Sequence, residues 1–414
     1  MQSQNSTIFT SYQKFVIFIL AITQFTVVLD FMVMSPLGDI MMKTLRITTS
    51  EFGVAVSAYA FSAGISGILT AGFADTFDRK KLLLFFYLGF IVGTLFCAIA
   101  PNYFFLVIAR IITGLFGGVI SSISMAIIAD LFSMQQRGKV MGFVQMGFGV
   151  SQVLGIPIGL YIASKSGWNI PFFWIAGMAT CIGIAIFIKM KPVRDHLLLQ
   201  NENSAFLHLW HTISQKNYRI GFLATALLSI GGFMMMPFGS AFAVNNLKVT
   251  MTQLPLMFMI TGIGTLVVMP FIGKLSDTID KVKIFAFATI LAIIVINIYA
   301  QFAATAFWIV VVTNVVMMIA IMSRFVPSSA LTSAIPNPEH RGAFMSVNSS
   351  LQQIAGGFGA MIAGLIIVQK DNFSPLEHYD TLAMIASAIM LFTIYLMFRV
   401  DAIVTKKQSR INKN

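Results

Sequence analysis

The amino-acid sequence is dominated by long apolar runs, each long enough to cross the hydrocarbon core of a bilayer. A transmembrane helix needs about 20 predominantly apolar residues. Twelve runs meet this requirement, at 15–36, 52–74, 82–100, 103–129, 139–163, 170–190, 218–243, 253–273, 283–302, 304–326, 342–368 and 380–399. Only 10% of the residues are charged, whereas a soluble domain carries about 25%. The sequence therefore predicts an all-α integral membrane protein.

Two short charged loops indicate an internal duplication. The segment 73–81, FADTFDRKK, is followed 202 residues later by the segment 275–283, LSDTIDKVK. Arg137-Gly138 and Arg341-Gly342 form a second pair at an offset of 204. Offsets near half the chain length are typical of transporters built from two parallel repeats. We expect two six-helix bundles with a loop between them and a tail, over 1–190, 191–217, 218–400 and 401–414.

The basic residues predict the orientation in the membrane. Of the 27 lysines and arginines, 20 fall on the side that holds both termini, 5 fall on the opposite side, and Arg110 and Arg324 lie inside apolar runs. Because cytoplasmic loops carry the excess of basic residues, we expect both termini in the cytoplasm and the protein in a bacterial inner membrane. The net charge of +12 then faces a membrane surface, so it requires no nucleic-acid partner.

Two opposite charges are expected at the same depth. Asp30 lies about 6 residues from the outer end of the first run, and Arg110 about 7 residues from the outer end of the fourth. At 1.5 Å per residue, both are about 9–11 Å below the same surface. A charge inside a membrane needs a partner or water. We therefore expect Asp30 and Arg110 to form a pair, direct or through water, that faces a cavity.

Polar side chains at helical spacing mark further faces that are expected to line a wet cavity. They occur in the first, fifth, tenth and eleventh runs, as Thr23, Thr26, Gln145, Gln152, Asn314, Arg324, Asn348 and Gln352. Arg324 is close enough to the cytoplasmic end of its run to extend to water. For this residue a substrate role and a structural role both remain open.

Motifs in this chain resemble those of the major facilitator superfamily. The family loop Gly-x-Leu-Ala-Asp-Arg-x-Gly-Arg-Lys stands here at 71–80, where Asp75, Arg79 and Lys80 match and Ala71 and Asp78 replace the two glycines. The fourth run carries the family's Arg-x-x-x-Gly at 110–114, and the fifth carries Gly-Ile-Pro at 155–157 without the exporters' Gly-Pro dipeptide. The chain is most similar to proton-coupled drug and metabolite exporters of the arabinose-efflux-like group.

The resemblance implies a mechanism of alternating access around a central cavity between the halves, in a protein that is usually a monomer. It implies proton coupling at Asp30, with Arg110 adjusting its proton affinity; a fixed structural ion pair is the alternative. It also implies a latch between the halves in the outward-open state, formed by Asp75, Arg79, Lys80, Asp277 and Lys281. The alternative for the latch is a solvated basic loop.

The expected function is export of a small organic compound, a drug or a metabolite, in exchange for protons. A proton symporter that imports a sugar or metabolite is the second interpretation. A membrane enzyme lacks support, because no run carries a Ser/His/Asp set, a metal cluster or a nucleotide loop. The expected partners are the lipid bilayer, protons and the small-molecule substrate, with the proton gradient as energy source and no cofactor or metal.

Overall fold

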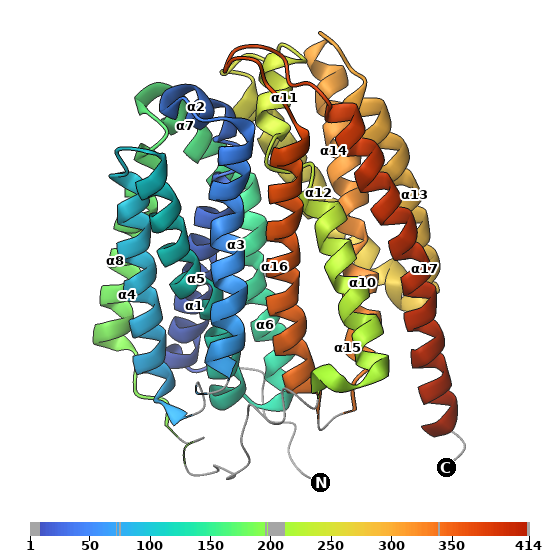
Figure 1. Cartoon of the computed structure of the whole chain (residues 1–414). Helices are drawn as coiled ribbons and strands as arrows, with labels where there is room; N and C mark the ends of the chain where they lie inside the picture. Colours follow the sequence, from blue (N-terminus) through green and yellow to red (C-terminus); the bar gives the residue numbers. More distant parts are fainter. Residues whose placement is uncertain are drawn as a thin grey trace.

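The computed structural model describes residues 9–71, 73, 76–194, 197, 212–337 and 340–411. This part of the chain is almost entirely helical, with one isolated β-bridge between Val368 and Glu377. Most helices run along one common direction and form a tall bundle (Figure 1). The all-α prediction is confirmed.

Nine helical segments form the N-terminal half. They are α1 (Ser11–Val33), α2 (Gly38–Leu45), α3 (Thr49–Ala71), α4 (Arg79–Ala98), α5 (Tyr103–Leu131), α6 (Met134–Val150), the π-helix η2 (Ser151–Gly155), α7 (Ile156–Ser166) and α8 (Ile170–Lys189), counted over the described residues.

The C-terminal half repeats this plan. Its helices within the described residues are α10 (Lys216–Phe233), α11 (Gly239–Asn245), α12 (Leu254–Thr278), α13 (Lys281–Ala300), α14 (Phe307–Ser323), α15 (Phe325–Ala334), α16 (Arg341–Ile366) and α17 (Tyr379–Ile411). The two halves meet where α3 packs along α16, where α12 packs against η2 and α7, and where α2 contacts α11.

Ten helical spans of the described chain are long and apolar enough to cross a membrane. The two other predicted runs correspond to α10 with α11, which are separated by a turn, and to α16, which is rich in serine and glutamine. The tenth of the twelve predicted runs, 304–326, is longer in the structure, where its helical span covers Phe307–Ala334. Polar residues fit within this last part of the span because their side chains bond to the backbone of the same helix. The Thr332 hydroxyl donates to the Ser328 carbonyl at 2.9 Å.

The last helix is longer than the sequence predicts. We expect the final span at 380–399 and a tail from 401, whereas α17 runs without interruption to Ile411. Most of the expected central loop, 191–217, lies outside the described residues. Its first residues, 191–194, pack back against the start of α4, where the Arg79 N–H donates to the Val193 carbonyl.

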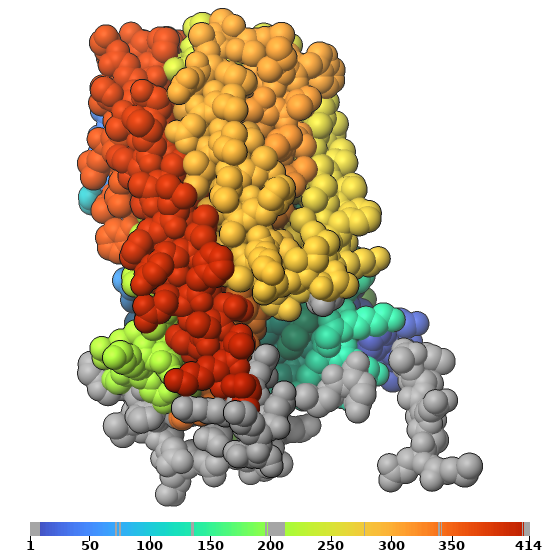
Figure 2. Space-filling view, turned by 90° about the vertical axis from the view of Figure 1, so that its right-hand side faces the viewer, coloured from blue at the N-terminus to red at the C-terminus, as the bar shows by residue number. Residues whose placement is uncertain are grey.

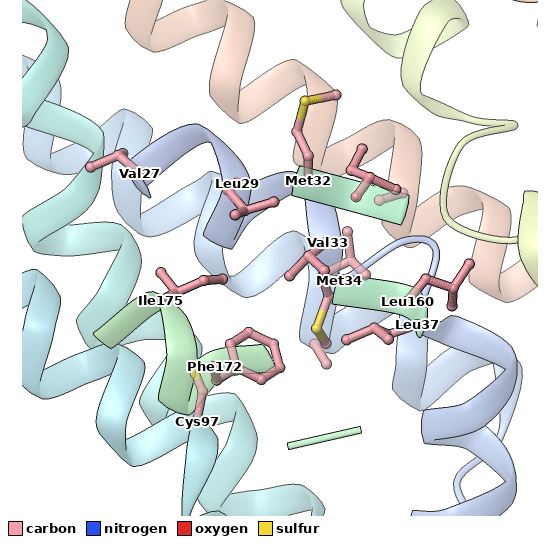
Figure 3. Close-up of a cluster of buried hydrophobic side chains, with 14 of the residues drawn as sticks. Val27, Leu29, Met32, Val33, Met34, Leu37, Cys97, Leu160, Phe172 and Ile175 are labelled. Atoms are coloured by element: carbon pink, nitrogen blue, oxygen red, sulfur yellow. The ribbon is translucent and has the colours of Figure 1, made fainter. Parts of the chain in front are cut away.

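A continuous cluster of buried apolar side chains fills the N-terminal half and extends into the C-terminal half. Figure 3 shows part of it, where Met32 and Val33 of α1, Leu160 of α7 and Phe172 of α8 converge. Each of these four side chains is almost completely buried. Burying an apolar side chain of this size contributes about 1.5–3 kcal/mol in water.

The outer surface is apolar as well, as a lipid-facing surface requires. Figure 2 shows the face covered by α13 and α17, in orange and red. Large side chains are exposed along it, including Phe287, Ile294, Phe392 and Phe398, each at least half accessible. A soluble protein rarely exposes a patch of this kind. The membrane-protein prediction agrees with this surface.

The two ends of the bundle differ in charge. One end, called here the basic end, carries the starts of α4, α6 and α13 with Arg79, Arg137 and Lys281. The opposite end, called the far end, carries α2 and α11 (Figure 1). Helix α1 begins and helix α17 ends at the basic end.

Candidate functional site

A cavity of about 80 Å³ lies between the two halves. The N-terminal half lines it with α1, the turn after α1, and the region of η2 and α7, through Met32, Ser35, Pro36, Gln152 and Ile156. The C-terminal half provides the other 18 of its 23 lining residues. This central cavity is therefore built mainly by one half.

The wall of the central cavity is rich in methionine. Seven methionines line it: Met32, Met235, Met236, Met257, Met317, Met318 and Met322. Phe233, Phe258 and Phe325 add aromatic faces. Because methionine is unbranched and polarisable, a methionine-rich wall adapts to apolar ligands of different shape.

Polar groups occupy one side of the cavity, along α12. The Thr265 hydroxyl lies 3.4 Å from Gln152 Oε1, and the Thr261 hydroxyl lies 2.8 Å from Asn314 Oδ1. Thr261 and Thr265 are four residues apart, so they lie on the same face on successive turns. The Tyr299 hydroxyl is buried at the same cavity, beside the Asn314 side chain.

Two prolines explain why the helices are irregular beside the cavity. Pro157 has no N–H, so the chain before it forms a π-turn over Ser151–Gly155, in which the Ile156 N–H bonds to the Ser151 carbonyl. Such π-turns are frequent at functional sites. Pro327 has a different effect: it lies in the first turn after a break at Arg324, which divides the tenth span into α14 and α15.

Gly262 permits the close packing that brings Gln152 to the cavity. A Cβ at this position would lie 2.9 Å from the Gln152 carbonyl oxygen. Only glycine therefore allows α12 to lie this close to the π-turn.

Asp30 and Arg110 form a direct ion pair inside the N-terminal half. Arg110 Nη1 is 2.8 Å from Asp30 Oδ2, and both side chains are at most 1% exposed. Thr94 of α4 donates to the other carboxylate oxygen at 3.2 Å. The Arg110 guanidinium also stacks over the Tyr59 ring, 4.6 Å from its centroid. The direct contact of Asp30 with Arg110, which their equal depth in the membrane predicted, is therefore present.

This pair does not line the central cavity, contrary to our expectation. Its face of α1 is turned towards α4 and α5, and Thr26 on the same face shares a hydrogen bond of 2.9 Å with the Tyr87 hydroxyl. Thr23 is likewise fully buried. The polar groups of α4 and α5 satisfy this side of α1, so the opposite side, with Met32, faces the cavity.

A larger cleft of about 800 Å³ separates the halves towards the basic end. The predicted residue Gln145 lines it, together with Ser121, Ser122 and the first turns of α16. On α16 the lining face holds Ser346, Ser349, Ser350 and Gln353. The predicted residues Asn348 and Gln352 belong to neighbouring faces and do not line the cleft.

Several predicted latch residues contact their own half. Arg79 Nε lies 3.2 Å from Asp130 Oδ2 at the end of α5. Lys80 Nζ donates to the Phe187 carbonyl of α8 at 2.9 Å, and Lys281 Nζ to the Ser276 carbonyl of α12 at 3.0 Å.

Two predicted latch residues have no described side chain. Asp75 lies outside the described residues, as does the side chain of Asp277. The latch therefore remains a prediction for a different conformation.

The far end contains a polar network that sequence reasoning missed. Asn245 Nδ2 donates to Asp39 Oδ1 at 2.6 Å, and Lys43 Nζ lies 2.8 Å from Asp39 Oδ2 and 3.1 Å from Asn245 Oδ1. Asp39 is 1% exposed. Asp39 and Lys43 belong to the N-terminal half and Asn245 to the C-terminal half, so the network joins the halves.

Further hydrogen bonds cross between the halves nearby. The Ser35 hydroxyl donates to the Met236 carbonyl, Ser240 Oγ donates to the Ser35 carbonyl at 3.0 Å, and Thr49 Oγ1 donates to the Ile367 carbonyl at 2.6 Å. The halves are thus joined by polar contacts at the far end, and a cleft lies between them towards the basic end, beside the contact of α3 with α16. In this conformation the bundle opens towards the basic end.

Arg324 is fully buried at the break between α14 and α15. Its Nε lies 3.2 Å from Thr289 Oγ1, and its guanidinium lies 5.6 Å from the centroid of the Phe285 ring. Nη1 and Nη2 have no hydrogen-bond partner among the described residues. Arg324 is not among the cavity-lining residues, although Met322 and Phe325 on either side of it are.

The fold and the two-half arrangement are those of a membrane transporter. The sequence model of the Major Facilitator Superfamily matches residues 20–238 and again 221–413. The chain belongs to this superfamily. The two matches correspond to the two halves that the repeated charged loops indicated.

Named relatives and a solved structure agree with this assignment. MFS-type transporter YceJ of Bacillus subtilis (strain 168) is 22% identical over 89% of this chain and 94% of its own length. A probable sugar efflux transporter of Helicobacter pylori (strain G27) is 24% identical over 68% of this chain and 72% of its own. A crystal structure of a mutant of the nucleoside transporter NupG has a similar fold, with a TM-score of 0.75 at 14% identity, over 94% of this chain and 99% of its own.

Proposed function

We propose that this protein exports a small organic compound, a drug or a metabolite, from the bacterial cytoplasm in exchange for protons. It acts as a transporter and not as an enzyme. It is expected to work as a monomer in the inner membrane, with both termini and the basic end in the cytoplasm. The proton gradient supplies the energy, and no cofactor is needed.

The buried Asp30–Arg110 pair carries this proposal. A carboxylate completely removed from water keeps its charge only through a close cation. Movement of α1 relative to α5 changes the separation of Asp30 Oδ2 and Arg110 Nη1 from 2.8 Å, and with it the affinity of Asp30 for a proton. Thr94 stays on the other oxygen and keeps the carboxylate oriented.

The direction of opening supports export. The halves are joined at the far end, and the cleft lined by Gln145 and Ser346 opens towards the basic end. A compound in the cytoplasm can enter from this side. The resemblance to an efflux transporter of Helicobacter pylori points to the same direction.

The test uses inside-out vesicles that contain the full-length protein and an acidic lumen monitored with a pH-sensitive dye. Adding a substrate from a panel of drugs and metabolites should release protons from the lumen. Asp30→Asn should abolish this release at equal expression. Asp380→Asn, an exposed carboxylate at the start of α17, is the matched control and should leave the release unchanged.

Full proton release by Asp30→Asn would refute the coupling role. Proton uptake into the lumen instead of release would indicate a symporter that imports a sugar or metabolite. Both outcomes are read from the sign and size of the same fluorescence signal.

A further inference from the structure

The charges buried within the spans do not cancel. Among the described residues, three ionisable groups with full charge are buried away from the membrane ends: Asp30, Arg110 and Arg324. Asp30 and Arg110 neutralise each other at 2.8 Å. Arg324 has no acidic partner within the described chain, and two of its nitrogens have no hydrogen bond. The described part of the interior therefore carries one positive charge, that of Arg324, without an acidic partner.

This charge lies behind the wall of the central cavity. Arg324 stands between Met322 and Phe325, whose side chains line the cavity. Its guanidinium points towards Thr289 of α13, so it acts on a ligand through its field and not by contact. In a medium of low polarity this field extends further than in water. A cation in the cavity is repelled and an anion is attracted.

Hydrogen-bond donors in the cavity match an anion as well. The amides of Gln152 and Asn314 are held by Thr265 and Thr261 on successive turns of α12. The Cβ atoms of threonines at this spacing lie about 5–6 Å apart, so both amides are held on the same side of the cavity. A ligand group between them can contact both halves of the protein, because Gln152 belongs to one half and Asn314 to the other.

The donor count does not depend on how each amide is oriented. Each threonine hydroxyl has one proton and also lies 2.8 Å from a carbonyl of its own helix, that of Met257 or Gly262. Whether the amide oxygen or the amide nitrogen faces the threonine, at least one N–H of each amide remains for a ligand. The buried Tyr299 hydroxyl, which lies beside Asn314, adds a third polar group at the same cavity.

We propose that the central cavity binds an amphipathic organic anion. An aromatic or alkyl body lies against the methionine-rich wall, and a carboxylate or sulfonate receives hydrogen bonds from Gln152, Asn314 and Tyr299. This proposal rests on the proposed function, since it names the class of compound that the exporter carries.

Two fluorescent probes with the same skeleton test the proposal. 8-Anilinonaphthalene-1-sulfonate carries a sulfonate, and N-phenyl-1-naphthylamine lacks it. Each is titrated into purified full-length protein in lipid nanodiscs, and the signal of empty nanodiscs is subtracted. The protein should bind the sulfonate at least about tenfold more tightly than the neutral probe, as expected for hydrogen bonds to a charged group. An excess of the tetraphenylphosphonium cation should not displace the sulfonate.

Substitutions locate the site. The double variant Gln152→Leu with Asn314→Leu should weaken sulfonate binding about tenfold and leave the neutral probe within about twofold. Asn297→Leu is the matched control, because Asn297 is an amide of the C-terminal half that bonds Ser387 at 2.7 Å and does not line the cavity. Arg324→Met should reduce the preference for the sulfonate and Arg324→Lys should retain it. If Arg324→Met does not fold, the amide variants decide.

Equal binding of both probes, displacement by the cation, or unchanged sulfonate binding in the double variant would overturn the proposal. The assay needs no proton gradient, so its outcome is separate from that of the transport test. Sulfonate binding without proton release in vesicles would refute the exporter and leave the anion site in place. Proton release driven by tetraphenylphosphonium alone would support the exporter and refute the anion site.

Discussion

Asp39 and Asn245 meet across the far end of the molecule, with the Asn245 amide nitrogen 2.6 Å from a carboxylate oxygen of Asp39. They belong to different halves, and each lies in a short helix that follows a Pro-x-Gly turn, at 36–38 and 237–239. Both short helices lead to a residue with positive φ, Arg46 at 53° and Lys248 at 62°. The contact is therefore made by equivalent elements of the two repeats.

Removing the Asp39 carboxylate should open the far end. In Asp39→Ala, Lys43 and Asn245 lose their shared partner, and hydrogen bonds to a charged group are worth about 1.5–3 kcal/mol each. A cysteine placed at Ser240, which is 1% exposed, should then react at least about tenfold faster with a thiol reagent applied from that side. Cys181 is replaced by serine in this background because it is exposed.

The control for this experiment is Glu377→Gln. Glu377 pairs with Lys370 at 2.7 Å at the same end, but both side chains are exposed and belong to one half. Exposed pairs contribute little, so the reactivity at position 240 should not change. Equal reactivity of the Asp39→Ala and parent proteins would show that the network does not hold the far end closed.

The Asp30–Arg110 pair should behave as a unit in stability measurements. Arg110→Gln leaves a buried carboxylate without its cation, which costs about 3–5 kcal/mol. Adding Asp30→Asn removes that charge, so the double variant should be more stable than Arg110→Gln alone. Unfolding of the purified protein followed by helical circular dichroism measures all variants.

Lys283→Gln is the control for the ion pair, because its contact with Asp280 spans 3.7 Å between exposed side chains. Its stability should equal that of the parent. If the double variant is less stable than Arg110→Gln, the two groups do not compensate each other.

Gly114 should tolerate no side chain. A Cβ there would lie 2.4 Å from the Tyr59 carbonyl oxygen and 2.1 Å from Ser62 Oγ. Gly114→Ala should force α3 and α5 apart and cost about 1–3 kcal/mol. Gly142→Ala is the contrast, because nothing lies within 4 Å of its Cβ position in α6. That substitution should be neutral or stabilise by up to about 1 kcal/mol. The same unfolding assay compares the two, and equal stabilities would contradict the packing account.

The contribution of Asp78 should depend on pH. Burial raises the pKa of Asp78, but hydrogen bonds from Arg194 and from the backbone N–H groups of Val193, Lys80 and Lys81 outweigh it and hold the pKa below 3.8. A carboxylate with a lowered pKa stabilises the fold above its ordinary pKa, and the contribution is lost as the pH falls through the lowered value. Asp78→Asn should therefore lower the Tm at pH 7 by the equivalent of about 1 kcal/mol.

The Tm difference between Asp78→Asn and the parent should shrink as the pH falls below 3.8. Asp380→Asn, at an exposed position, should show no difference at either pH. A constant difference across this range would mean that Asp78 acts through its shape as a helix cap and not through its charge.

The depth of residues in the membrane was predictable from the sequence, but the direction of their side chains was not. Depth follows from the helical rise, which is why Asp30 and Arg110 were correctly paired. Both sides of a membrane helix are apolar, so hydropathy does not reveal which side faces the cavity. This is why Thr23 and Gln352 were assigned to a cavity, whereas Met32 and Gln353 line one.

In the sequence, buried charges were sought as ionisable residues inside apolar runs, and this criterion could not find the far-end network. Asp39 and Lys43 follow the end of the first apolar run and resemble loop residues. The signal that would have located them is a third repeat, Met-x-Pro-x-Gly at 34–38 and 235–239. The breaks at Pro157 and Pro327 were likewise visible as prolines, but their effect on the helices depends on the neighbouring packing.

Helix α1 presents different chemistry on its two sides. Asp30 faces the interior of the N-terminal half, and Met32 faces the central cavity. Under the proposed function, a proton and a transported molecule do not compete for one carboxylate. Exchange therefore requires thermodynamic linkage between the two sites through the position of α1, in which protonation of Asp30 weakens binding in the cavity. Kinetically, this predicts that lowering the pH on the cytoplasmic side lowers the occupancy of the cavity at a given substrate concentration, although Asp30 does not line the cavity.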